Sequence, residues 1–294
     1  MGKARMKARV LTIHDHQREM EQNRYVYAVL SRRSGGVSIG INLNPDKVCN
    51  FDCIYCQVDR TTPGRYRKVD LKILEQELKK MLAQASNGTL FDHPPFAGIP
   101  EPLRQVKDIA FSGDGEPTTY PRFKEAVELA IRTKDEVGLA HLKIVIITNA
   151  TMFHRPKVKE TLALLDQHNG EIWAKLDAGT EEYYRLVDVT SIPFQRVLDN
   201  ILEVARRRPI VIQSLFMKIH GVGPDEKAIM AYCDRLREIV VRGGKISLVQ
   251  VYTVARPPAQ PYVAPLSDTE IDAIADAVRQ VHLPVVSFDS GQEV

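Results

Sequence analysis

Three cysteines stand within eight residues, in the segment Cys49-Asn-Phe-Asp-Cys53-Ile-Tyr-Cys56. Thiolates are the usual ligands of iron–sulfur clusters, and the C-x3-C-x2-C spacing lets one loop wrap a compact cluster. Three ligands leave one metal corner open, and an open coordination position is where a substrate binds a metal. We therefore predict an iron–sulfur cluster on Cys49, Cys53 and Cys56 with one iron free of protein ligands.

Other functions compete for these cysteines. A structural zinc site takes four ligands; no second C-x-x-C or H-x3-H follows nearby, and His93, in a proline-rich loop, is a candidate fourth donor. A ferredoxin-like electron carrier takes a fourth cysteine, and the remaining one, Cys233, stands inside a predicted helix. A disulfide framework fits neither the clustering nor a reducing cytosol. The spacing favours the cluster over all three alternatives.

Short apolar runs alternate with amphipathic stretches along the chain, which predicts strands and helices in turn. The predicted strands cover residues 38–43, 108–112, 143–148, 171–177, 209–218 and 246–253, with a further apolar run at 284–288. The predicted helices cover residues 71–82, 121–137, 158–168, 194–207, 226–241 and 271–281. Ser267 and Glu270 form a capping-box pattern ahead of the last helix.

Six repeats of strand and helix imply an α/β fold with parallel strands joined by right-handed crossovers. An open doubly wound sheet and a barrel, complete or partial, both fit this pattern. In either architecture functional residues gather where strands end and loops begin. Residues 1–30 show no clear period and are interpreted as an N-terminal arm or cap, and residues 31–294 as one α/β domain.

The composition sets broad limits on the class of protein. The chain has 294 residues, of which 44% are hydrophobic and 26% charged, so we expect a substantial core and no global disorder. The net charge of +3 is weak support for an anionic partner. No run approaches the ~20 apolar residues of a membrane helix, and the N-terminus lacks a signal-peptide pattern. We expect a cytoplasmic protein without a membrane partner.

Polar residues mark the ends of the other predicted strands. They are, in chain order, Gly113, Gly115 and Glu116; Thr148 and Asn149; Lys175 and Asp177; Gln213; and Tyr252. Glycines at a strand end permit positive φ and close approach of the backbone to a ligand. The first three groups also have a structural alternative: a glycine-rich turn, a helix N-cap at Thr148 and Asn149, or a buried ion pair of Lys175 and Asp177, which face the same side of their strand.

The cysteine motif, with Tyr55 just before the last cysteine and its place after the first strand, resembles the signature of the radical S-adenosylmethionine (SAM) superfamily. The resemblance implies a [4Fe–4S] cluster on the three cysteines, with the amino and carboxylate groups of SAM on the fourth iron. It implies a redox enzyme in which one electron from a reducing donor cleaves SAM to methionine and a 5′-deoxyadenosyl radical. It further implies a partial (β/α)6 TIM-like barrel over residues 35–280.

The resemblance also implies roles for the strand-end residues. Gly113-Asp114-Gly115-Glu116 resembles the family's glycine-glycine-glutamate motif, which binds the SAM amino group, although Asp114 departs from that pattern. The remaining implied contacts with SAM or substrate are those of Thr148, Asn149, Lys175, Asp177, Gln213 and Tyr252.

Segments 31–43, 175–179 and 252–258 look like a bacterial branch related to the wyosine tRNA synthase. That synthase needs a second cluster on N-terminal cysteines, and residues 1–48 here contain none. Basic residues around the motif fit the phosphates of an RNA substrate or a solvated surface: Arg32, Arg33, Arg60, Arg65, Arg67 and Lys68. A small-molecule or peptide substrate, activation of a glycyl-radical partner, and a non-catalytic [4Fe–4S] sensor are the alternatives.

Overall fold

The computed structural model describes residues 23–92, 94 and 96–288. Within these residues eight strands form one curled sheet in the order β1-β2-β3-β4-β5-β6-β8-β10. Only β1 runs antiparallel to its neighbour, and every later pairing is parallel. The strands are β1 (Val26–Ser31), β2 (Gly36–Ile41), β3 (Val106–Phe111), β4 (Lys143–Thr148), β5 (Gly170–Lys175), β6 (Ile210–Leu215), β8 (Ile246–Tyr252) and β10 (Val285–Phe288).

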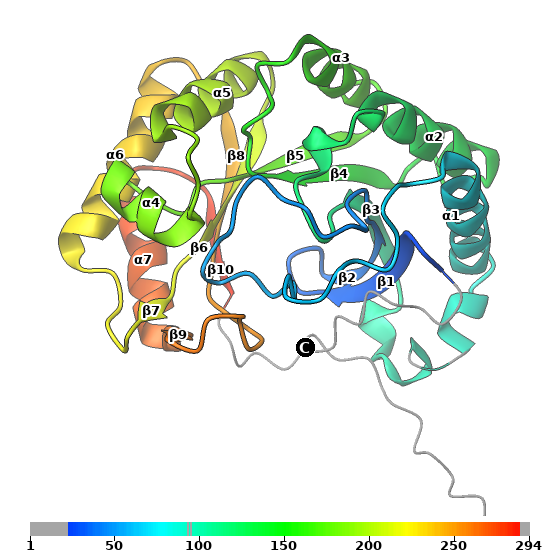
Figure 1. The fold of residues 1–294 in the computed structure, drawn as a ribbon, viewed down its shortest axis with the longest axis horizontal. Coiled ribbons are helices and arrows are strands. Elements are labelled where there is room, and N and C mark those ends of the chain that lie inside the picture. The colour runs from blue at the N-terminus through cyan, green and yellow to red at the C-terminus, as the bar shows by residue number, and fades with distance from the viewer. Residues whose placement is uncertain (1–22, 93, 95, 289–294) are drawn as a thin grey trace, which may run out of the picture.

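Helices lie outside the curve of the sheet, so the architecture is a partial barrel (Figure 1). They are α1 (Leu71–Ser86), α2 (Phe123–Glu136), α3 (Pro156–Leu165), α4 (Glu181–Asp188), α5 (Phe194–Arg207), α6 (Glu226–Val241) and α7 (Asp268–Gln280). Short 3-10 turns cover Thr89–Asp92, Phe96–Gly98, Glu101–Leu103 and Pro117–Thr119. A two-stranded antiparallel sheet joins β7 (Lys218–Ile219) to β9 (Val263–Ala264).

The alternation of side chains along the strands separates two environments. Side chains on one face of the sheet, such as those of Ile109, Ile144 and Ile172, are buried against the helices. Side chains on the opposite face point to the inside of the barrel, where Val145 and Trp173 belong to a smaller apolar cluster. Because successive side chains of a strand point to opposite faces, polar residues two positions from Trp173 on the same strand also face the inside of the barrel.

The partial barrel that the family resemblance implied is confirmed, and the apolar run at 284–288 forms β10. The structure differs from the expected boundary at residue 30, because Val26–Ser31 is an edge strand of the same sheet. Residues 1–22 of the expected arm, and His93, lie outside the described residues. Helix α4 was not predicted. Among the described residues, no helix has the length and apolar character needed to cross a membrane.

Candidate active site

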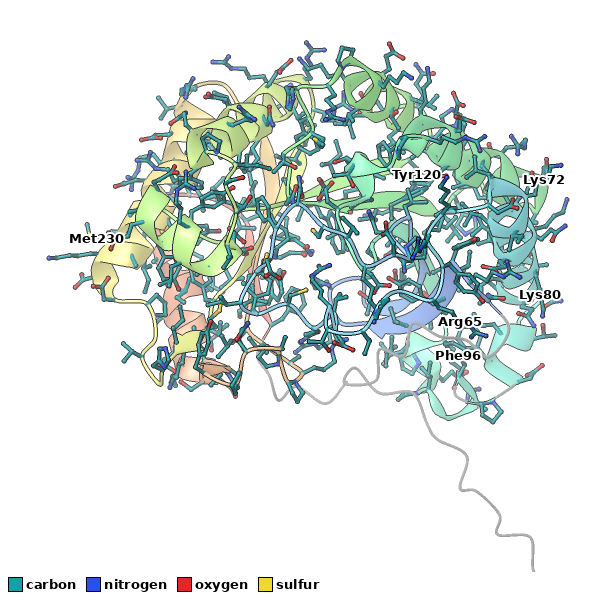
Figure 2. The ribbon with its side chains drawn as sticks, in the orientation of Figure 1. Arg65, Lys72, Lys80, Phe96, Tyr120 and Met230 are labelled. Carbon is teal, nitrogen blue, oxygen red and sulfur yellow. The ribbon has the colours of Figure 1, made fainter. Side chains whose placement is uncertain are left out.

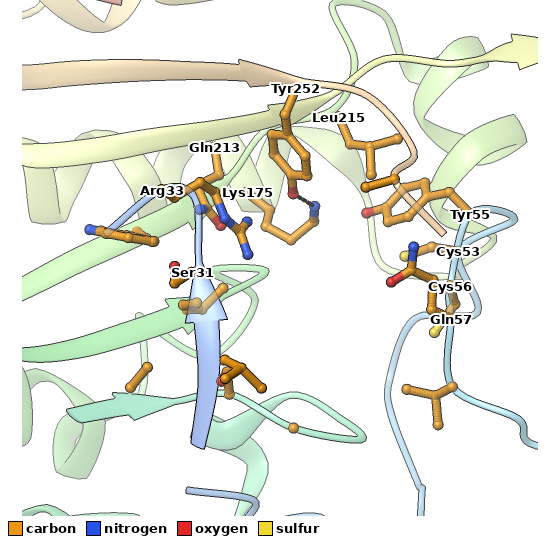
Figure 3. A pocket seen from close by; sticks show the side chains of 18 of the residues that line it. Ser31, Arg33, Cys53, Tyr55, Cys56, Gln57, Lys175, Gln213, Leu215 and Tyr252 are labelled. Atoms are coloured by element: carbon orange, nitrogen blue, oxygen red, sulfur yellow. Dashed lines mark hydrogen bonds between the residues drawn. The ribbon is translucent and has the colours of Figure 1, made fainter. Parts of the chain in front are cut away.

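The three cysteines lie on the irregular segment between β2 and α1, as predicted. All three thiols are half-buried and line one cavity of about 300 Å³ inside the barrel. The backbone N–H of Cys56 donates to the carbonyl of Cys53 at 2.9 Å, which closes a turn between these two residues. One loop therefore presents three sulfur atoms to one cavity, and Figure 3 shows two of these residues, Cys53 and Cys56.

The cysteine loop is held by the unpredicted helix α4. The N–H of Ile54 donates to the carbonyl of Val187 at 2.9 Å, and the N–H of Asp52 donates to the carbonyl of Asp188 at 3.2 Å. Val189 ends the helix at φ 42°, a left-handed conformation that is costly for a β-branched residue. The end of α4 thus turns its last carbonyl groups toward the cysteine loop.

Charged groups contact two of the thiols. The Sγ of Cys53 lies 3.4 Å from Oδ1 of Asp188, and a guanidinium nitrogen of Arg60 lies 3.6 Å from the Sγ of Cys56. Burial raises the pKa of the Cys53 thiol well above its usual range, and the nearby Asp188 carboxylate adds to this shift. Burial also raises the pKa of Asp188 to about 8. Asp188 carries no local sequence signal, because it stands at the end of a helix that the sequence did not reveal.

Glu116 follows β3 and is almost fully buried. Its carboxylate accepts hydrogen bonds from the N–H of Thr118 at 3.0 Å, the hydroxyl of Thr118, the hydroxyl of Thr148 at 2.7 Å and the N–H of Asn149 at 2.7 Å. Burial raises its pKa, although these hydrogen bonds oppose the shift. The side chain therefore joins the ends of β3 and β4, and its oxygens are engaged within the protein.

Gly113 and Gly115 allow close packing against the segment that carries the cysteines. A Cβ atom on Gly115 would lie 2.2 Å from the carbonyl oxygen of Val48, and one on Gly113 would lie 2.4 Å from Oδ1 of Asn42. Neither glycine adopts a positive φ. Of the two properties that glycine permits, these residues use close approach, and the approach is to neighbouring parts of the protein itself.

Thr148 and Asn149 end β4 in a tight turn. The hydroxyl of Thr148 accepts from the N–H of Ala150 at 3.0 Å, and Ala150 adopts φ 62°. The amide of Asn149 donates to Oδ1 of Asn50 at 2.8 Å, which ties this turn to the cysteine loop. The alternative of a helix N-cap is wrong, because α3 begins only at Pro156, after Arg155 as its N-cap. Both Thr148 and Asn149 line the cavity.

Lys175 and Asp177 form the ion pair that their shared strand face predicts. The Nζ of Lys175 lies 3.0 Å from Oδ2 of Asp177 and donates to the hydroxyl of Tyr252 at 3.0 Å. The same carboxylate accepts from the hydroxyl of Tyr55 at 2.6 Å and from the N–H of Leu215 at 2.7 Å. Burial lowers the pKa of Lys175, but Asp177, Tyr252 and Cys53 together outweigh the effect of burial, and the pKa is raised. Lys175 lines the cavity, whereas Asp177 is buried behind Tyr55 and is not part of the lining.

Gln213 on β6 and Tyr252 on β8 complete the predicted set, and both line the cavity. The Nε2 of Gln213 donates to Oε1 of Gln250 at 2.7 Å. Its own Oε1 is buried and has no hydrogen-bond partner among the described residues. A buried acceptor without a partner is costly, so this atom is suited to a donor on a bound molecule.

The geometry thus brings the three cysteines and eight of the nine other predicted residues to one cavity, with Asp177 behind it. The sequence profile of the family described as "Radical SAM superfamily" matches residues 43–233, more than half of the chain. The chain belongs to the radical SAM superfamily. The match begins just before the cysteine loop and ends in α6, so it includes β3 to β6.

Relatives among known proteins are similar over different shares of their length. GTPase Obg of Brachyspira hyodysenteriae is 27% identical over 195 residues, which are 64% of this chain and 24% of that protein. A UPF0026 protein of Helicobacter pylori is 26% identical over 246 residues, which are 83% of this chain and 70% of that protein. The chain therefore spans about a quarter of the first relative (24%) and over two thirds of the second (70%).

Two solved structures share the radical SAM fold. A radical SAM methyltransferase from Sphaerobacter thermophilus superposes with a TM-score of 0.61 and 13% identity, covering 90% of this chain and 68% of that one. TYW1 with a lysine–pyruvate adduct bound superposes with a TM-score of 0.53 and 13% identity, covering 87% of this chain and 84% of that one. At this identity the likeness concerns the fold alone, and it agrees with the partial barrel.

Radical SAM proteins use a [4Fe–4S] cluster and SAM, and the residues here fit both. Among the described residues no three His, Cys, Asp or Glu side chains converge closely enough to hold a single metal ion. A [4Fe–4S] cluster does not require its ligands to converge on one ion, because each iron takes a single thiolate. Cys49, Cys53 and Cys56 would hold three irons, and the cavity beside them continues along the strand ends.

Proposed function

We propose that this chain binds its cluster through Cys49, Cys53 and Cys56 and cleaves SAM reductively. The observation that carries the proposal is that the three thiols line the same cavity as the polar ends of β3 to β8. The bound and reduced cluster would supply one electron to SAM, and cleavage would give methionine and a 5′-deoxyadenosyl radical able to take a hydrogen atom from the substrate. The reaction needs an external reducing donor, so the enzyme is of the iron–sulfur oxidoreductase type.

The strand ends supply the contacts for SAM in this proposal. The backbone between Gly113 and Glu116 faces the cavity beside the cysteine loop, and Glu116 fixes that backbone rather than contacting SAM through its carboxylate. Thr148 and Asn149 contribute polar groups at the end of β4. The unpartnered Oε1 of Gln213 is an acceptor for a donor group of SAM or of the substrate.

Lys175 and Tyr252 provide the charged and aromatic side of the cavity. The Nζ of Lys175 lies 4.8 Å from the ring centroid of Tyr55 and 5.5 Å from that of Tyr252. Asp177 keeps Lys175 protonated and holds the Tyr55 hydroxyl, so it positions groups that line the cavity without lining it itself. We assign Lys175 and Tyr252 to contact with SAM or substrate and Asp177 to a positioning role.

The test of the proposal is anaerobic reconstitution with iron and sulfide, followed by dithionite and SAM. We expect 5′-deoxyadenosine from the wild-type chain, and loss of the cluster in Cys49→Ala, Cys53→Ala and Cys56→Ala. Cys233→Ser is the control, because Cys233 is buried in α6, away from the cysteine loop. A chain that holds its cluster and leaves SAM intact would be a [4Fe–4S] sensor, and full iron in any of the three alanine variants would refute the ligand assignment.

A specific surface favours RNA as the substrate class. The segment from Cys56 to α1 exposes Arg65, Arg67 and Lys68, and α1 adds Lys72. The guanidinium groups of Arg24 and Arg65 lie 5.0 Å and 5.6 Å from the ring centroid of Tyr66. In Figure 2 Arg65 and Lys72 both lie on the right-hand side of the view. Cations combined with an aromatic ring suit a nucleic-acid backbone with unstacked bases.

Binding to bulk tRNA at several salt concentrations tests the RNA proposal. Removal of two phosphate contacts in Arg65→Gln/Arg67→Gln should weaken binding and reduce the salt slope by about 2. Lys227→Gln, an exposed lysine on α6, is the control. An unchanged affinity and slope in the double variant would remove RNA from the proposal and leave SAM cleavage untouched.

A further inference from the structure

The turn between β1 and β2 closes the end of the cavity that lies away from the cysteines. Arg33 in this turn extends into the barrel, where Figure 3 shows its guanidinium group beside Lys175 and Tyr252. The Cζ of Arg33 lies 5.0 Å from the ring centroid of Tyr252 and 5.9 Å from that of Trp173. Two aromatic faces therefore hold the guanidinium group at the wall of the cavity.

The Arg33 guanidinium has one carboxylate within electrostatic range, that of Asp108, but no ion pair joins the two. Among the described residues no ion pair of Arg33 is found, whereas the neighbouring Lys175 is paired with Asp177 at 3.0 Å. Asp108 also lines this end of the cavity, but it is almost fully buried and accepts a hydrogen bond from the hydroxyl of Ser38. Stacking on rings leaves the N–H edge of a guanidinium group available, since ring faces do not accept all five donors.

A held guanidinium group with free N–H donors is suited to planar, bidentate binding of a carboxylate or a phosphate. The cavity wall strengthens such a contact because charges interact more strongly away from bulk water. We infer that the end of the cavity formed by Arg33, Trp173 and Tyr252 binds an oxyanion of the substrate, either a carboxylate or a phosphate. This inference rests on the proposed function, because it takes the cavity beside the cysteines as the place of reaction.

Trp173 makes the inference measurable, because it is the one tryptophan of the chain. We would titrate the anaerobically reconstituted full chain, without SAM, with succinate and with pyrophosphate at constant ionic strength, and follow Trp173 fluorescence. Succinamide serves as the uncharged counterpart of succinate. We expect a saturable change with at least one oxyanion, at a dissociation constant of about 10 mM or tighter, and none with succinamide. Saturation by succinate alone selects a carboxylate, and saturation by pyrophosphate alone selects a phosphate.

Variants of Arg33 distinguish binding at this site from a nonspecific effect of the added anions. Arg33→Gln should weaken binding at least tenfold, and Arg33→Lys should also weaken it, because a point charge does not replace the bidentate contact. Arg132→Gln, an exposed arginine of α2 paired with Glu75, is the matched control and should titrate like wild type. Wild-type affinity in Arg33→Gln, or no saturation by either oxyanion, would overturn the inference. Formation of 5′-deoxyadenosine is measured separately, so either result leaves the test of SAM cleavage intact.

Discussion

The hydroxyl of Thr148 donates a hydrogen bond of 2.7 Å to the carboxylate of Glu116, across the ends of two neighbouring strands. The N–H of Asn149 donates to the other oxygen of the same carboxylate at 2.7 Å. This contact fixes the end of β3 to the end of β4 on the wall of the cavity. It also explains why a buried acidic side chain is retained there, since each of its oxygens is paired with donors.

We predict that Glu116→Ala weakens SAM binding by at least about tenfold, or ~1.4 kcal/mol, while the iron content is retained. The loss leaves the donors of Thr118 and Asn149 without partners and frees the strand ends. Glu116→Gln should not restore affinity, because its amide nitrogen cannot accept a hydrogen bond. Calorimetric titration with SAM on the reconstituted chain measures both effects. Glu125→Ala, an exposed partner of Arg122, is the control.

Unchanged SAM affinity in Glu116→Ala would show that the β3–β4 contact does not shape the SAM site. A variant that loses iron as well would place Glu116 in support of the cysteine loop instead.

Gly115→Ala should displace the cysteine loop. The added methyl group would meet the carbonyl oxygen of Val48 at 2.2 Å, so the backbone next to Cys49 must shift. We expect reduced iron per chain after reconstitution and a loss of about 1–3 kcal/mol in the free energy of unfolding, as for other overpacked sites. Iron analysis and denaturant unfolding check the two effects.

Gly223→Ala is the comparison for this substitution, because its Cβ would meet only the flexible ends of two side chains, Leu266 at 3.1 Å and Glu270 at 3.5 Å. Equal iron content and equal stability in the two alanine variants would contradict the tight packing of Gly115 against Val48.

Glu77 anchors the edge strand to α1. Its buried carboxylate accepts from the backbone N–H groups of Arg24 at 2.7 Å, Tyr25 at 2.9 Å and Val26 at 3.1 Å. Glu77→Ala leaves these donors unpaired, so we predict a loss of about 2–4 kcal/mol in the free energy of unfolding. Glu75→Ala, which removes a surface ion pair with Arg132, should cost about 1 kcal/mol or less. Similar losses in both variants would argue against the anchoring role.

Glu270 makes the stability of the α7 N-terminus depend on pH. Its carboxylate accepts from the N–H of Ser267 at 2.7 Å and lies 3.0 Å from the Nζ of Lys218. Hydrogen bonds from the backbone and hydroxyl of Ser267, followed by that from Lys218, lower its pKa to about 2. Because the pKa is lower in the folded chain, the charged carboxylate stabilises the fold at pH values above the pKa of the unfolded chain, about 4.3. This stabilisation is lost as pH falls toward 2.

Wild type should therefore be more stable than Glu270→Gln at pH 7, and the gap should shrink as pH falls from about 5 toward 2. Thermal unfolding midpoints of the two chains across this range provide the measurement. A gap that stays constant with pH would mean that the charge of Glu270 does not support the cap.

The sequence by itself determined the features that depend on neighbours along the chain. The spacing of Cys49, Cys53 and Cys56 fixes what one loop can ligate, because three thiols so close in sequence share one segment. Short apolar runs and amphipathic stretches of period 3.6 determined the order of most strands and helices, since burial follows the geometry of each element. The edge strand was missed although residues 26–30, Val-Tyr-Ala-Val-Leu, form an apolar run, because residues 1–30 taken together show no clear period.

Tertiary structure alone decided which distant groups meet. Asp188 contacts Cys53 because the end of α4 packs on the cysteine loop, and Arg33 reaches Tyr252 because the β1–β2 turn folds into the barrel. The carboxylate of Glu116 was expected at SAM, yet its oxygens are engaged by the end of β4. Such contacts depend on how the sheet curls and on which side chains compete for each hydrogen bond. Residues adjacent in sequence determine neither the curl of the sheet nor this competition. The residue types therefore indicated the chemistry, and only the tertiary structure showed which groups are partners.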